Sequence, residues 1–556
     1  MGLVSIDRVG THEVTNQVPS FTGSDLFASD RVLVDAVARW GDSGESPSLH
    51  DLGTLAGSPT AHRWADDAER YPPRLRTHAA TGERADQVDY HPGYHSLLGT
   101  AVAHGLTADP WTRPVGSGAH LRRAVGFVVW SQVDAGHGCP VSMTYAAVPA
   151  LRHDPDLAAR WVSRLAARRY EPELRPLPDK DGALCGMGMT EKQGGSDLKA
   201  NTTRATPAVD GPVPGVAYRL TGHKWFCSAP MSDGFLMLAQ APGGLTCFVV
   251  PRVLDDGARN PFALQRLKDK LGNRSNASSE VELDGTWGSR LGDEGRGVRT
   301  IIDMVAATRL DCVLGSAATM RAALARAVHH ARHRSAFGAL LVDQPLMLAV
   351  LADLAVESEA ATLLGMRLAH AVDEGESAFL RLAVAAAKFW VCKRTPPMVA
   401  EALECLGGNG YVEENGLARL YREAPLNSIW EGSGNVNALD VLRAVTREPA
   451  AVDAFARELE PSLGLDPRLD TAVDGTLAAV RAAHAFGTGD AAIGARRLVS
   501  DLAVTLQAAL LVRYSPAVVA ETFLASRLGG VDGRVFGSLP IGAAAAAEVV
   551  GGAVAG

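Results

Sequence analysis

The sequence contains no C-x-x-C pair, no long apolar run and no excess of basic residues. Its seven cysteines are scattered along 556 residues. This spacing argues against a disulfide framework and against a structural zinc site, and no metal site is predicted. The formal net charge of −8 excludes a uniformly basic nucleic-acid coat, although a local basic patch is compatible with it.

A membrane-spanning helix is not expected, because no stretch of about 18 uncharged apolar residues is present. The nearest candidate, the alanine-rich segment after Ile541, is interrupted by Glu548 and by glycines. The first residues also lack the basic and then apolar pattern of a signal peptide. The sequence therefore predicts a cytoplasmic protein that does not contact a membrane.

Three common cofactor or nucleophile motifs are missing. The sequence has no P-loop, no G-x-G-x-x-G after a strand and no G-x-S-x-G elbow. His329 and His333 are four residues apart, but the glutamate of an H-E-x-x-H zinc motif is absent between them. These two histidines are therefore interpreted as part of a basic helix face.

The chain divides into four regions by the pattern of its apolar residues. Helical spacing dominates residues 1–182 and 293–445, whereas residues 183–292 contain short alternating runs typical of strands (217–228, 235–240 and 245–251). Residues 446–556 form an alanine- and leucine-rich extension that is also expected to be helical. This order predicts a mainly α protein with a middle β domain, not alternating βαβ units.

Residues 187–197 (Met-Gly-Met-Thr-Glu-Lys-Gln-Gly-Gly-Ser-Asp) open the predicted β domain. The Gly-Gly-Ser turn can present backbone N–H groups and the Ser196 hydroxyl to an anion such as a pyrophosphate. An ordinary polar β-turn is the alternative, and it is the better interpretation if the motif is taken alone.

Residues 222–228 (Gly-His-Lys-Trp-Phe-Cys-Ser) place aromatic side chains on a predicted strand, followed by a small hydroxyl. They are consistent either with a flat wall against a ring system or with a core strand.

Residues 429–435 (Ile-Trp-Glu-Gly-Ser-Gly-Asn) place one carboxylate, that of Glu431, between Trp430 and a glycine-rich turn. A glutamate partly removed from water has a raised pKa and becomes a usable base near neutral pH. The alternative is a glutamate that caps a helix beginning near Val436, but the glycines and Trp430 make capping alone less attractive.

Together, in this order and at these separations, the three stretches resemble the acyl-CoA dehydrogenase family. Further matches are Arg334-x-x-Phe337-Gly338 followed by Gln344, KLGNRS at 270–275 and LGGNGY at 406–411. The segments TEKQGGSD, KDKLGNRSNAS, LYREAPLNSIWEGSGN and TNQVPSF are similar to the AidB-like branch, which comprises alkylation-response flavoproteins. The resemblance covers essentially the whole chain.

This resemblance implies an acyl-CoA dehydrogenase-like fold. It consists of an N-terminal helical domain, a small β-barrel or sheet domain and a C-terminal four-helix domain, followed by the AidB-like helical extension. The family usually assembles as a homotetramer that binds FAD between the β domain, helices and a neighbouring subunit. Such a binding mode agrees with the missing dinucleotide fingerprint.

The resemblance also implies a set of cofactor-binding residues. Met189, Thr190 and Ser196 match positions that line the flavin and its pyrophosphate. Phe226 matches the aromatic position against the isoalloxazine, and Ser228 the hydroxyl beside it. Segments that reach FAD across a subunit interface are also matched. The full expected set is Met187, Met189, Thr190, Gly195, Ser196, Phe226, Ser228, Arg334, Phe337, Gln344, Gly407, Gly408, Trp430, Gly432, Ser433 and Asn435.

Glu431 falls where many family members carry the catalytic base. The resemblance implies that it removes the α proton of a small acyl thioester while a hydride passes from the β carbon to flavin N5. Hydrogen bonds to the thioester carbonyl, including one from the base's own backbone N–H, stabilise the developing charge. AidB-like proteins are described as weak dehydrogenases of short or branched acyl-CoA that are linked to the alkylation-damage response.

Two departures from the family pattern bear on the substrate. Trp430 replaces the usual tyrosine, and Lys192-Gln193 replaces a Pro-Gly pair. Both changes add bulk or charge beside the expected substrate path. An alternative is therefore a flavin oxidase or oxygenase that acts on a non-CoA substrate, such as an amine.

A second alternative is a DNA-binding protective flavoprotein with residual catalysis, because the branch is credited with binding double-stranded DNA through its C-terminal region. Residues 446–556 contain nine arginines, no lysine and twelve acidic residues, whereas non-specific DNA affinity depends on neutralised phosphates. An arginine face on the extension, or a channel formed by a tetramer, remains compatible with this alternative. The candidate arginines are Arg496, Arg497, Arg513, Arg527 and Arg534.

Overall fold

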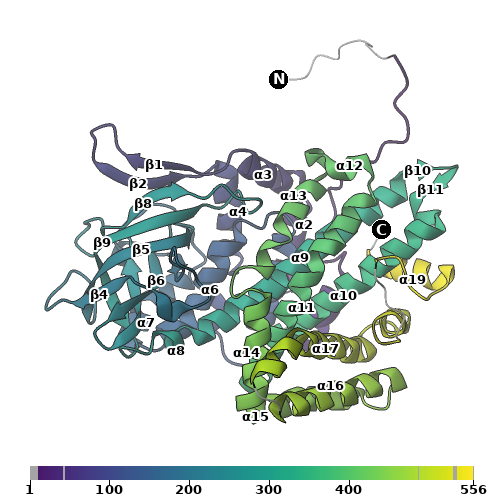
Figure 1. Cartoon of the computed structure of the whole chain (residues 1–556). Helices are drawn as coiled ribbons and strands as arrows, with labels where there is room; N and C mark the ends of the chain where they lie inside the picture. Colours follow the sequence, from purple (N-terminus) through teal and green to yellow (C-terminus); the bar gives the residue numbers. More distant parts are fainter. Residues whose placement is uncertain (1–10, 42–43, 45, 486–487, 530–534, 555–556) are drawn as a thin grey trace.

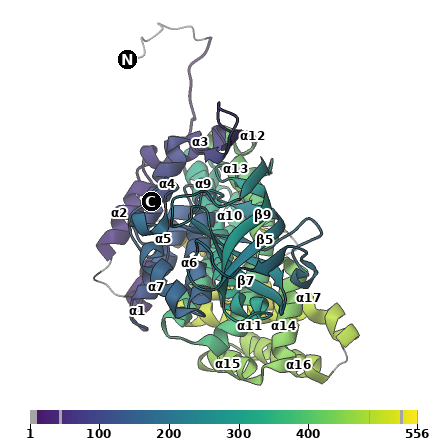
Figure 2. The same ribbon diagram turned by 90° about the vertical axis from the view of Figure 1, so that its left-hand side faces the viewer.

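The computed structural model describes residues 11–41, 44, 46–485, 488–529 and 535–554. Figure 1 shows a β domain on the left and long helices on the right, with the last helices of the chain below and beside them. Figure 2, turned by a quarter, shows strands β5, β7 and β9 in front of helices α10 and α11.

The first part of the chain is mostly helical, and several helices begin at a side-chain cap. The Asp30 carboxylate accepts hydrogen bonds from the backbone N–H groups of Val32 and Leu33, and Asp154 caps its helix in the same way. The helices are α1 (Arg31–Trp40), α2 (Ser46–Ala56), α3 (Pro59–Arg70), α4 (Pro92–Ala103), α5 (Ala119–Ser131), α6 (Gly138–Leu151) and α7 (Pro155–Leu165).

A two-stranded hairpin interrupts this helical region, although the apolar spacing predicted helices and loops alone. Strands β1 (Arg74–His78) and β2 (Arg84–Asp89) pair antiparallel. Arg76 joins them by donating to Asp89 and Gln87 across the hairpin. The strands are mostly polar, and Val88 packs into the core of the β domain. Apolar periodicity therefore missed a hairpin that is stabilised by cross-strand polar pairs and by docking.

The middle of the chain forms a closed sheet. The strand order is β3-β6-β4-β5-β9-β7, with β8 on β9 and a further pairing of β6 with β7 that closes the ring. The predicted strands and the hairpin between β6 and β7 are confirmed. The strands are β3 (Cys185–Gly188), β4 (Arg204–Pro207), β5 (Ala217–Ser228), β6 (Gly234–Ala241), β7 (Gly244–Pro251), β8 (Ala263–Leu267) and β9 (Ser278–Leu291).

Long helices follow the β domain and pack against one another. Their buried faces are rich in alanine and leucine, which allow close packing of the helices. The small β10–β11 hairpin lies between the first two long helices. The elements are α8 (Gly297–Thr300), α9 (Ile302–His333), β10 (Ser335–Ala336), β11 (Ala339–Leu340), α10 (Pro345–Asp373), α11 (Ser377–Glu404), α12 (Gly408–Tyr411), α13 (Leu417–Glu423) and α14 (Gly434–Arg447).

The C-terminal extension is helical, as expected. Figure 1 shows α15, α16 and α17 below the long helices, whereas α19 lies beside α10. The extension comprises α15 (Pro449–Leu459), α16 (Pro467–Ala485), α17 (Thr488–Tyr514), α18 (Ala517–Phe523) and α19 (Ala543–Ala553).

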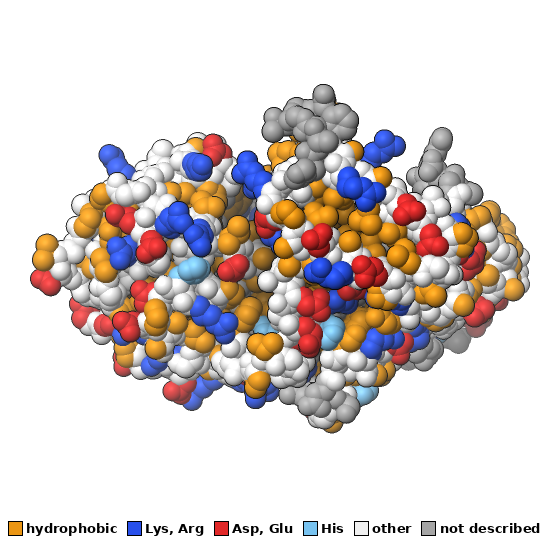
Figure 3. Space-filling model, turned by 90° about the horizontal axis from the view of Figure 1, so that it is seen from below, with side chains coloured by type: hydrophobic (Ala, Val, Ile, Leu, Met, Phe, Trp, Pro, Cys, Tyr) orange, Lys and Arg blue, Asp and Glu red, His pale blue; other side chains and the backbone are white. Residues whose placement is uncertain are grey.

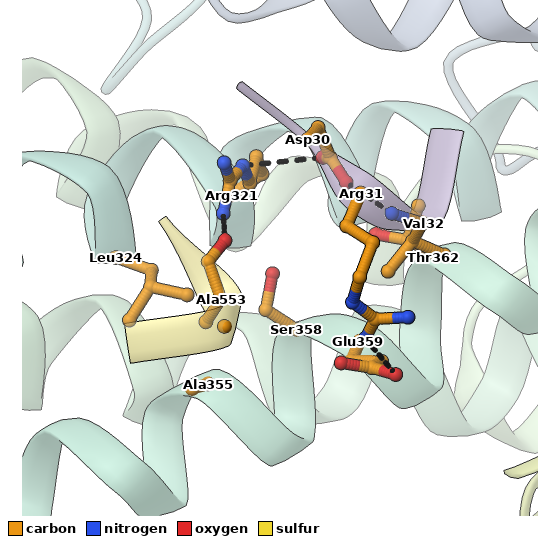
Figure 4. Close-up of a pocket in the computed structure, with 11 residues that line it drawn as sticks. Asp30, Arg31, Val32, Arg321, Leu324, Ala355, Ser358, Glu359, Thr362 and Ala553 are labelled. Atoms are coloured by element: carbon orange, nitrogen blue, oxygen red, sulfur yellow. Dashed lines mark hydrogen bonds and ion pairs between the residues drawn. The ribbon is translucent and has the colours of Figure 1, made fainter. Parts of the chain in front are cut away.

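One buried arginine joins the start of α1 and the end of α19 to the helix core (Figure 4). Arg321 on α9 donates hydrogen bonds to the carbonyl oxygens of Ser29 (2.6 Å) and Ala553 (2.5 Å), and it forms an ion pair with Asp30 (3.1 Å). Because Arg321 and Asp30 are buried, removing the guanidinium would leave a buried carboxylate without its ionic partner and two carbonyls without this donor.

We expect Arg321→Met to loosen α19 from the helix core. The loss of a buried ionic partner costs about 3 kcal/mol, so backbone amides of α19 should exchange with solvent much faster than in the unmodified protein. Hydrogen-exchange mass spectrometry measures this. Arg70→Met, on an exposed position of α3, is the matched control. Unchanged protection of α19 in Arg321→Met would contradict the role of this arginine.

Candidate functional site

Glu431 lies in the short segment before α14, in a strained backbone conformation. Its φ of +56° belongs to the left-handed region that favours glycine, and Gly432 follows with a φ of +93°. The Glu431 carboxylate accepts a hydrogen bond of 2.5 Å from the Thr308 hydroxyl on α9. Arg309, the next residue of that helix, donates to the Glu431 carbonyl at 3.1 Å. Helix α9 therefore holds both ends of this glutamate.

A buried lysine holds the backbone on both sides of Glu431. Lys388 on α11 is 1% exposed, and its ammonium group donates to the carbonyl of Trp430 at 2.7 Å and to that of Gly432. Asn437 also donates to the Gly432 carbonyl, at 2.6 Å. These contacts stabilise a turn that its backbone strain alone would disfavour.

An ion-pair network positions Arg309 itself. Arg309 contacts Asp440 on α14 at 2.6 Å, and Arg381 contacts the same carboxylate at 3.1 Å. Although burial opposes the effect, the two guanidinium groups hold the pKa of Asp440 below its usual range. Helices α9, α11 and α14 are thus joined directly behind the turn that carries Glu431.

Cys139, on α6, lies among polar groups of the β domain. Burial raises the pKa of the Cys139 thiol to about 11; Lys270 and a hydrogen bond from Ser228 oppose this shift, whereas Glu431 reinforces it. Cys139 thus shares its surroundings with Ser228 on β5 and with Glu431. The Ser228 hydroxyl also lies 3.0 Å from that of Ser278.

Lys270 belongs to the same region. Its ammonium group donates to the Asn276 carbonyl at 2.7 Å and to the Ser278 hydroxyl at 3.2 Å. Burial lowers the pKa of Lys270 to about 8. Lys270, Cys139 and the hydroxyls of Ser228 and Ser278 therefore form one polar cluster, and the charge of Glu431 acts on its thiol.

A second buried lysine holds the loop that carries Met189 and Thr190. Lys224 on β5 pairs with Glu191 at 2.9 Å, and both side chains are fully buried. Glu191 also accepts hydrogen bonds from the backbone N–H groups of Thr202 and Thr203. Although burial opposes the shift, Lys224 and these donors hold the pKa of Glu191 well below its usual range.

Thr190 is held beside Phe226 by the backbone of Trp225, the residue that precedes Phe226 in β5. The N–H of Trp225 donates to the Thr190 carbonyl at 2.9 Å. The Phe226 ring is 52% exposed, whereas Met187 on β3 is buried. The Gly-Gly-Ser turn begins close by, and a Cβ on Gly195 would lie 2.4 Å from the Thr190 hydroxyl oxygen. A side chain at position 195 would therefore displace the Thr190 side chain.

The two residues that replace the family's Pro-Gly pair have different surroundings. The Gln193 side chain donates to Glu191 at 2.8 Å and to the Ala200 carbonyl at 3.1 Å. Lys192 is exposed, and its ammonium group lies 5.6 Å from the Trp225 ring centroid. Gln193 thus helps to hold the loop, and Lys192 carries the added charge to the surface.

One residue of the glycine-rich segment contacts the C-terminal extension. Asn435, at the start of α14, accepts a hydrogen bond of 3.2 Å from Arg496 on α17. Trp430 donates from its indole N–H to Asn427 at 2.8 Å. Ser433 precedes α14 as its N-terminal cap residue. The predicted helix start near Val436 is therefore two residues late.

A second group of predicted cofactor residues lies elsewhere in the chain. Figure 1 shows the β10–β11 hairpin and α12 far from the β domain. Arg334 donates to the Asn16 carbonyl at 2.5 Å, and Gln344 donates to the Ala336 carbonyl at 3.1 Å. Phe337 is fully exposed. A single chain therefore does not bring Arg334, Phe337, Gln344, Gly407 and Gly408 together with Glu431.

The sequence patterns did not identify three residues that hold Glu431 and its turn. Thr308, Arg309 and Lys388 lie within long helices and belong to no local motif. Thr308 is 123 residues away from Glu431 along the chain, so only the packing of α9 and α11 shows the connection.

The arginines considered for DNA binding are mostly engaged within the chain. Arg513 pairs with Glu458 at 2.6 Å, and Arg527 pairs with Asp353 at 2.6 Å. Arg496 contacts Asn435, as described above, and Arg534 lies outside the described residues. Figure 3 shows basic and acidic side chains interspersed over the face seen from below.

Neither a metal-binding cluster nor a membrane-spanning helix occurs among the described residues. They contain no group of three or more His, Cys, Asp or Glu side chains placed to hold a metal ion. In the same part of the chain, no helix has both the length and the apolar character needed to cross a membrane.

Comparison with known families identifies three matching segments. Residues 16–172 match the family described as the adaptive response protein AidB N-terminal domain. Residues 186–286 match the acyl-CoA dehydrogenase middle domain, and residues 295–446 match the acyl-CoA dehydrogenase C-terminal domain. The chain is also 46% identical over 468 residues to the putative acyl-CoA dehydrogenase AidB of Escherichia coli (strain K12), which covers 83% of this chain and 86% of that one.

The chain belongs to the acyl-CoA dehydrogenase family. It is an AidB-like member and an oxidoreductase of the class that acts on CH–CH groups. Members of this family typically bind FAD. The predicted family and branch are thereby confirmed.

Solved structures confirm the fold. The crystal structure of Caenorhabditis elegans ACDH-11 in complex with C11-CoA matches with a TM-score of 0.81 and 27% identity, over 98% of this chain and 94% of that one. An acyl-CoA dehydrogenase from Bacillus anthracis complexed with FAD matches with a TM-score of 0.61 and 19% identity, over 78% of this chain and 77% of that one. The second likeness shows the fold alone.

We expect Lys388→Met to destabilise the protein, because the Trp430 carbonyl loses its donor at a cost of about 1–3 kcal/mol, whereas the Gly432 carbonyl keeps Asn437. The midpoint of thermal unfolding should fall by several degrees. Lys393→Met, at an exposed position of the same helix, is the control and should change it little. Equal effects of both substitutions would contradict the clamp around Glu431.

Proposed function

We propose that this chain is an FAD-dependent dehydrogenase that oxidises the Cα–Cβ bond of a small acyl thioester, with Glu431 as the base. The observation that carries this proposal is the position of the Glu431 carboxylate, which is held by the Thr308 hydroxyl in a left-handed turn before α14. The complex of the C. elegans relative with C11-CoA supports the substrate class. We further propose a weak activity on short or branched acyl-CoA, linked to the response to alkylation damage.

The residues at the β-domain edge fit a flavin nucleotide. Ser196 and the Gly194–Gly195 turn are accessible and offer hydrogen-bond donors, as a pyrophosphate requires. The half-exposed Phe226 ring offers a flat apolar face. Gly407 and Gly408 have open space where a side chain would begin, so a ligand can approach their backbone closely. When bound, FAD supplies the acceptor for the hydride that leaves the β carbon.

Each part of the site has a proposed task toward this cofactor. Thr190 and Ser228 hydrogen-bond the polar edge of the flavin, and Phe226 contacts its ring. Met187 and Met189 supply apolar contacts beside it. The turn formed by Trp430, Gly432, Ser433 and Asn435 lies on the side of the base, whereas Gly195 and Ser196 contact the pyrophosphate.

Glu431 can remove the α proton because its carboxylate has a single hydrogen-bond donor among the described residues, the Thr308 hydroxyl. Removing this proton leaves negative charge on the thioester carbonyl, which needs a donor. The backbone N–H of Glu431 is available for this role, since no acceptor within the described chain contacts it. The clamp by Lys388 fixes the direction of this N–H.

A second copy of the chain completes the proposed site. Arg334, Phe337, Gln344, Gly407 and Gly408 lie far from Glu431 in one chain (Figure 1), and the Phe337 ring is fully exposed. In a homotetramer, these residues reach the FAD of the neighbouring subunit, where the Arg334 guanidinium can pair with a phosphate. We propose that each subunit has four domains, formed by residues 1–182, 183–292, 293–445 and 446–556.

An anaerobic titration with isovaleryl-CoA tests the proposal. We follow the flavin absorption band near ~450 nm, which reports the redox state of the cofactor. Stoichiometric bleaching supports dehydrogenation of an acyl thioester. A flavin that is present but not bleached argues against this substrate class, and a protein purified without flavin would overturn the proposal.

We expect Glu431→Gln to retain FAD but to lower acyl oxidation by at least ~10²-fold, which is the lower range for a positioned base. Single-turnover bleaching of the flavin measures the effect. Glu414→Gln, at an exposed position before α13, is the matched control. Turnover that is unchanged in Glu431→Gln would place the base elsewhere.

We expect Arg334→Ala to weaken the retention of FAD, because a charged hydrogen bond to a phosphate is lost. The ratio of flavin to protein after gel filtration measures this. Arg299→Ala, at an exposed position of α8, is the control. An Arg334→Ala protein that remains fully loaded with FAD contradicts the phosphate role.

Two alternatives predict other results. A flavin oxidase of an amine-type substrate is reduced by that substrate, not by acyl-CoA, and is rapidly reoxidised by oxygen. A DNA-protecting flavoprotein binds double-stranded DNA with an affinity that falls steeply with salt. Failure to bind duplex DNA at low salt removes the second alternative.

A further inference from the structure

A cavity of about 250 Å³ lies beside the proposed site, at the junction of the β1–β2 hairpin, α4 and the β domain. Part of its wall comes from residues 87–98 and 170–172, within the segment that matches the AidB N-terminal domain. The remainder includes residues 229–233, after β5. Pro140 and Ala229 line the cavity. These residues directly follow Cys139 and Ser228 in the sequence.

Four aromatic rings form a continuous part of this wall. Tyr90 and Tyr94 are stacked with ring centroids 4.3 Å apart, and His95 lies 5.9 Å from both Tyr90 and Tyr170. The Tyr170 hydroxyl contacts His95 Nδ1 at 2.7 Å. Burial raises the pKa values of Tyr90 and Tyr170 and lowers that of His95. All four rings are therefore uncharged near neutral pH.

The charged side chains of the wall are all acidic. Asp89, Glu171, Glu173 and Asp233 line the cavity, and this lining, drawn from the described part of the chain, contains no lysine or arginine. Arg76, Arg175 and Lys180 reach Asp89, Glu171 and Asp233, respectively, from outside the lining. The cavity surface itself thus presents carboxylates.

Two further groups are available to a ligand. Glu173 forms no ion pair with a described residue, and its charge acts on Tyr170 and His95. Ser232 is 2% exposed, and its hydroxyl has no hydrogen-bond partner among the described residues. A buried hydroxyl of this kind ordinarily has a partner, so a ligand or a water in the cavity would satisfy it.

We propose that this cavity binds a small organic cation, such as an alkylated ammonium, at a site separate from that of the acyl thioester. Aromatic faces attract a cation through their quadrupole, and this attraction is stronger where water is excluded. Because Arg76, Arg175 and Lys180 pair with the other three carboxylates, Glu173 supplies the unbalanced negative charge, which disfavours anions such as CoA phosphates. The proposal goes beyond dehydrogenation and requires no turnover.

Isothermal titration calorimetry of the full-length FAD-loaded protein at pH 7.5 tests this. Choline is the probe cation, and 3,3-dimethylbutan-1-ol, which has carbon in place of nitrogen, is the neutral probe of the same shape. We expect choline to bind at least about tenfold more tightly, which corresponds to one desolvated cation–π contact. Equal binding of the two probes, or no binding of choline, overturns the proposal.

Two substitutions test whether choline binds in this cavity. Tyr170→Leu removes an aromatic face, and Glu173→Gln removes a charge at an exposed position. We expect a loss of choline affinity of about tenfold for the first and about threefold for the second. Glu83→Gln, in the loop between β1 and β2, is the matched control and should bind as the unmodified protein does.

Thermal unfolding shows whether each variant is folded. If Tyr170→Leu does not fold, the comparison of Glu173→Gln with Glu83→Gln carries the test alone. Affinity for choline that is unchanged in Glu173→Gln and in a folded Tyr170→Leu places its binding elsewhere and overturns the proposal.

A competition experiment separates this cavity from the proposed substrate site. Choline should bind with unchanged affinity in the presence of saturating isovaleryl-CoA, and Glu431→Gln should also bind it normally. Displacement of choline by the thioester would show one shared site and overturn the proposal. Choline binding is measured without turnover. Its result therefore does not depend on whether isovaleryl-CoA bleaches the flavin.

Discussion

Two carbonyl oxygens, those of Trp430 and Gly432, accept hydrogen bonds from one buried ammonium group, that of Lys388. Glu431 lies between them with a left-handed backbone, a conformation that costs a non-glycine residue about 1–3 kcal/mol. The buried lysine in turn needs these acceptors, because an unpaired charge in a helix core is costly. The lysine and the turn therefore stabilise each other, and the orientation of Glu431 depends on these hydrogen bonds.

A similar arrangement holds the opposite side of the site. Lys224 on β5 pairs with Glu191, and this carboxylate binds the backbone of the following segment. The loop that carries Thr190 is thereby attached to a rigid strand. Side chains for catalysis or binding are held most accurately when the elements beneath them are rigid. In this protein, α11 and β5 supply that rigidity through buried lysines.

Much of the fold and part of the site could be predicted from the sequence. The apolar patterns of residues 217–228 and 245–251 identified β5 and β7; β5 mixes buried and exposed positions, whereas β7 is buried on both faces. Glu431 was identified from its local context between a tryptophan and glycines. The β1–β2 hairpin was missed because its strands are mostly polar, and the Gly-Gly-Ser turn alone did not separate an anion site from an ordinary turn.

The partners of Glu431 could not be found in this way. Lys388 lies within a long helix and is 42 residues away from Trp430 in the sequence. Its charge would ordinarily indicate an exposed position, since lysine is almost never fully buried unless it is paired. Only the packing of α11 against the turn shows that this lysine is internal.

The sequence by itself determined the order of helical and β regions, the family and the set of candidate residues, because these follow from local periodicity and from short motifs. The tertiary structure alone decided which candidates meet. It joined the Thr190 loop to the strand that carries Phe226, left Phe337 exposed at a distance and formed the aromatic, acidic cavity between α4 and the β domain. The physical reason is that contacts between elements depend on how the whole chain packs, whereas local patterns record only which residues are buried or turn.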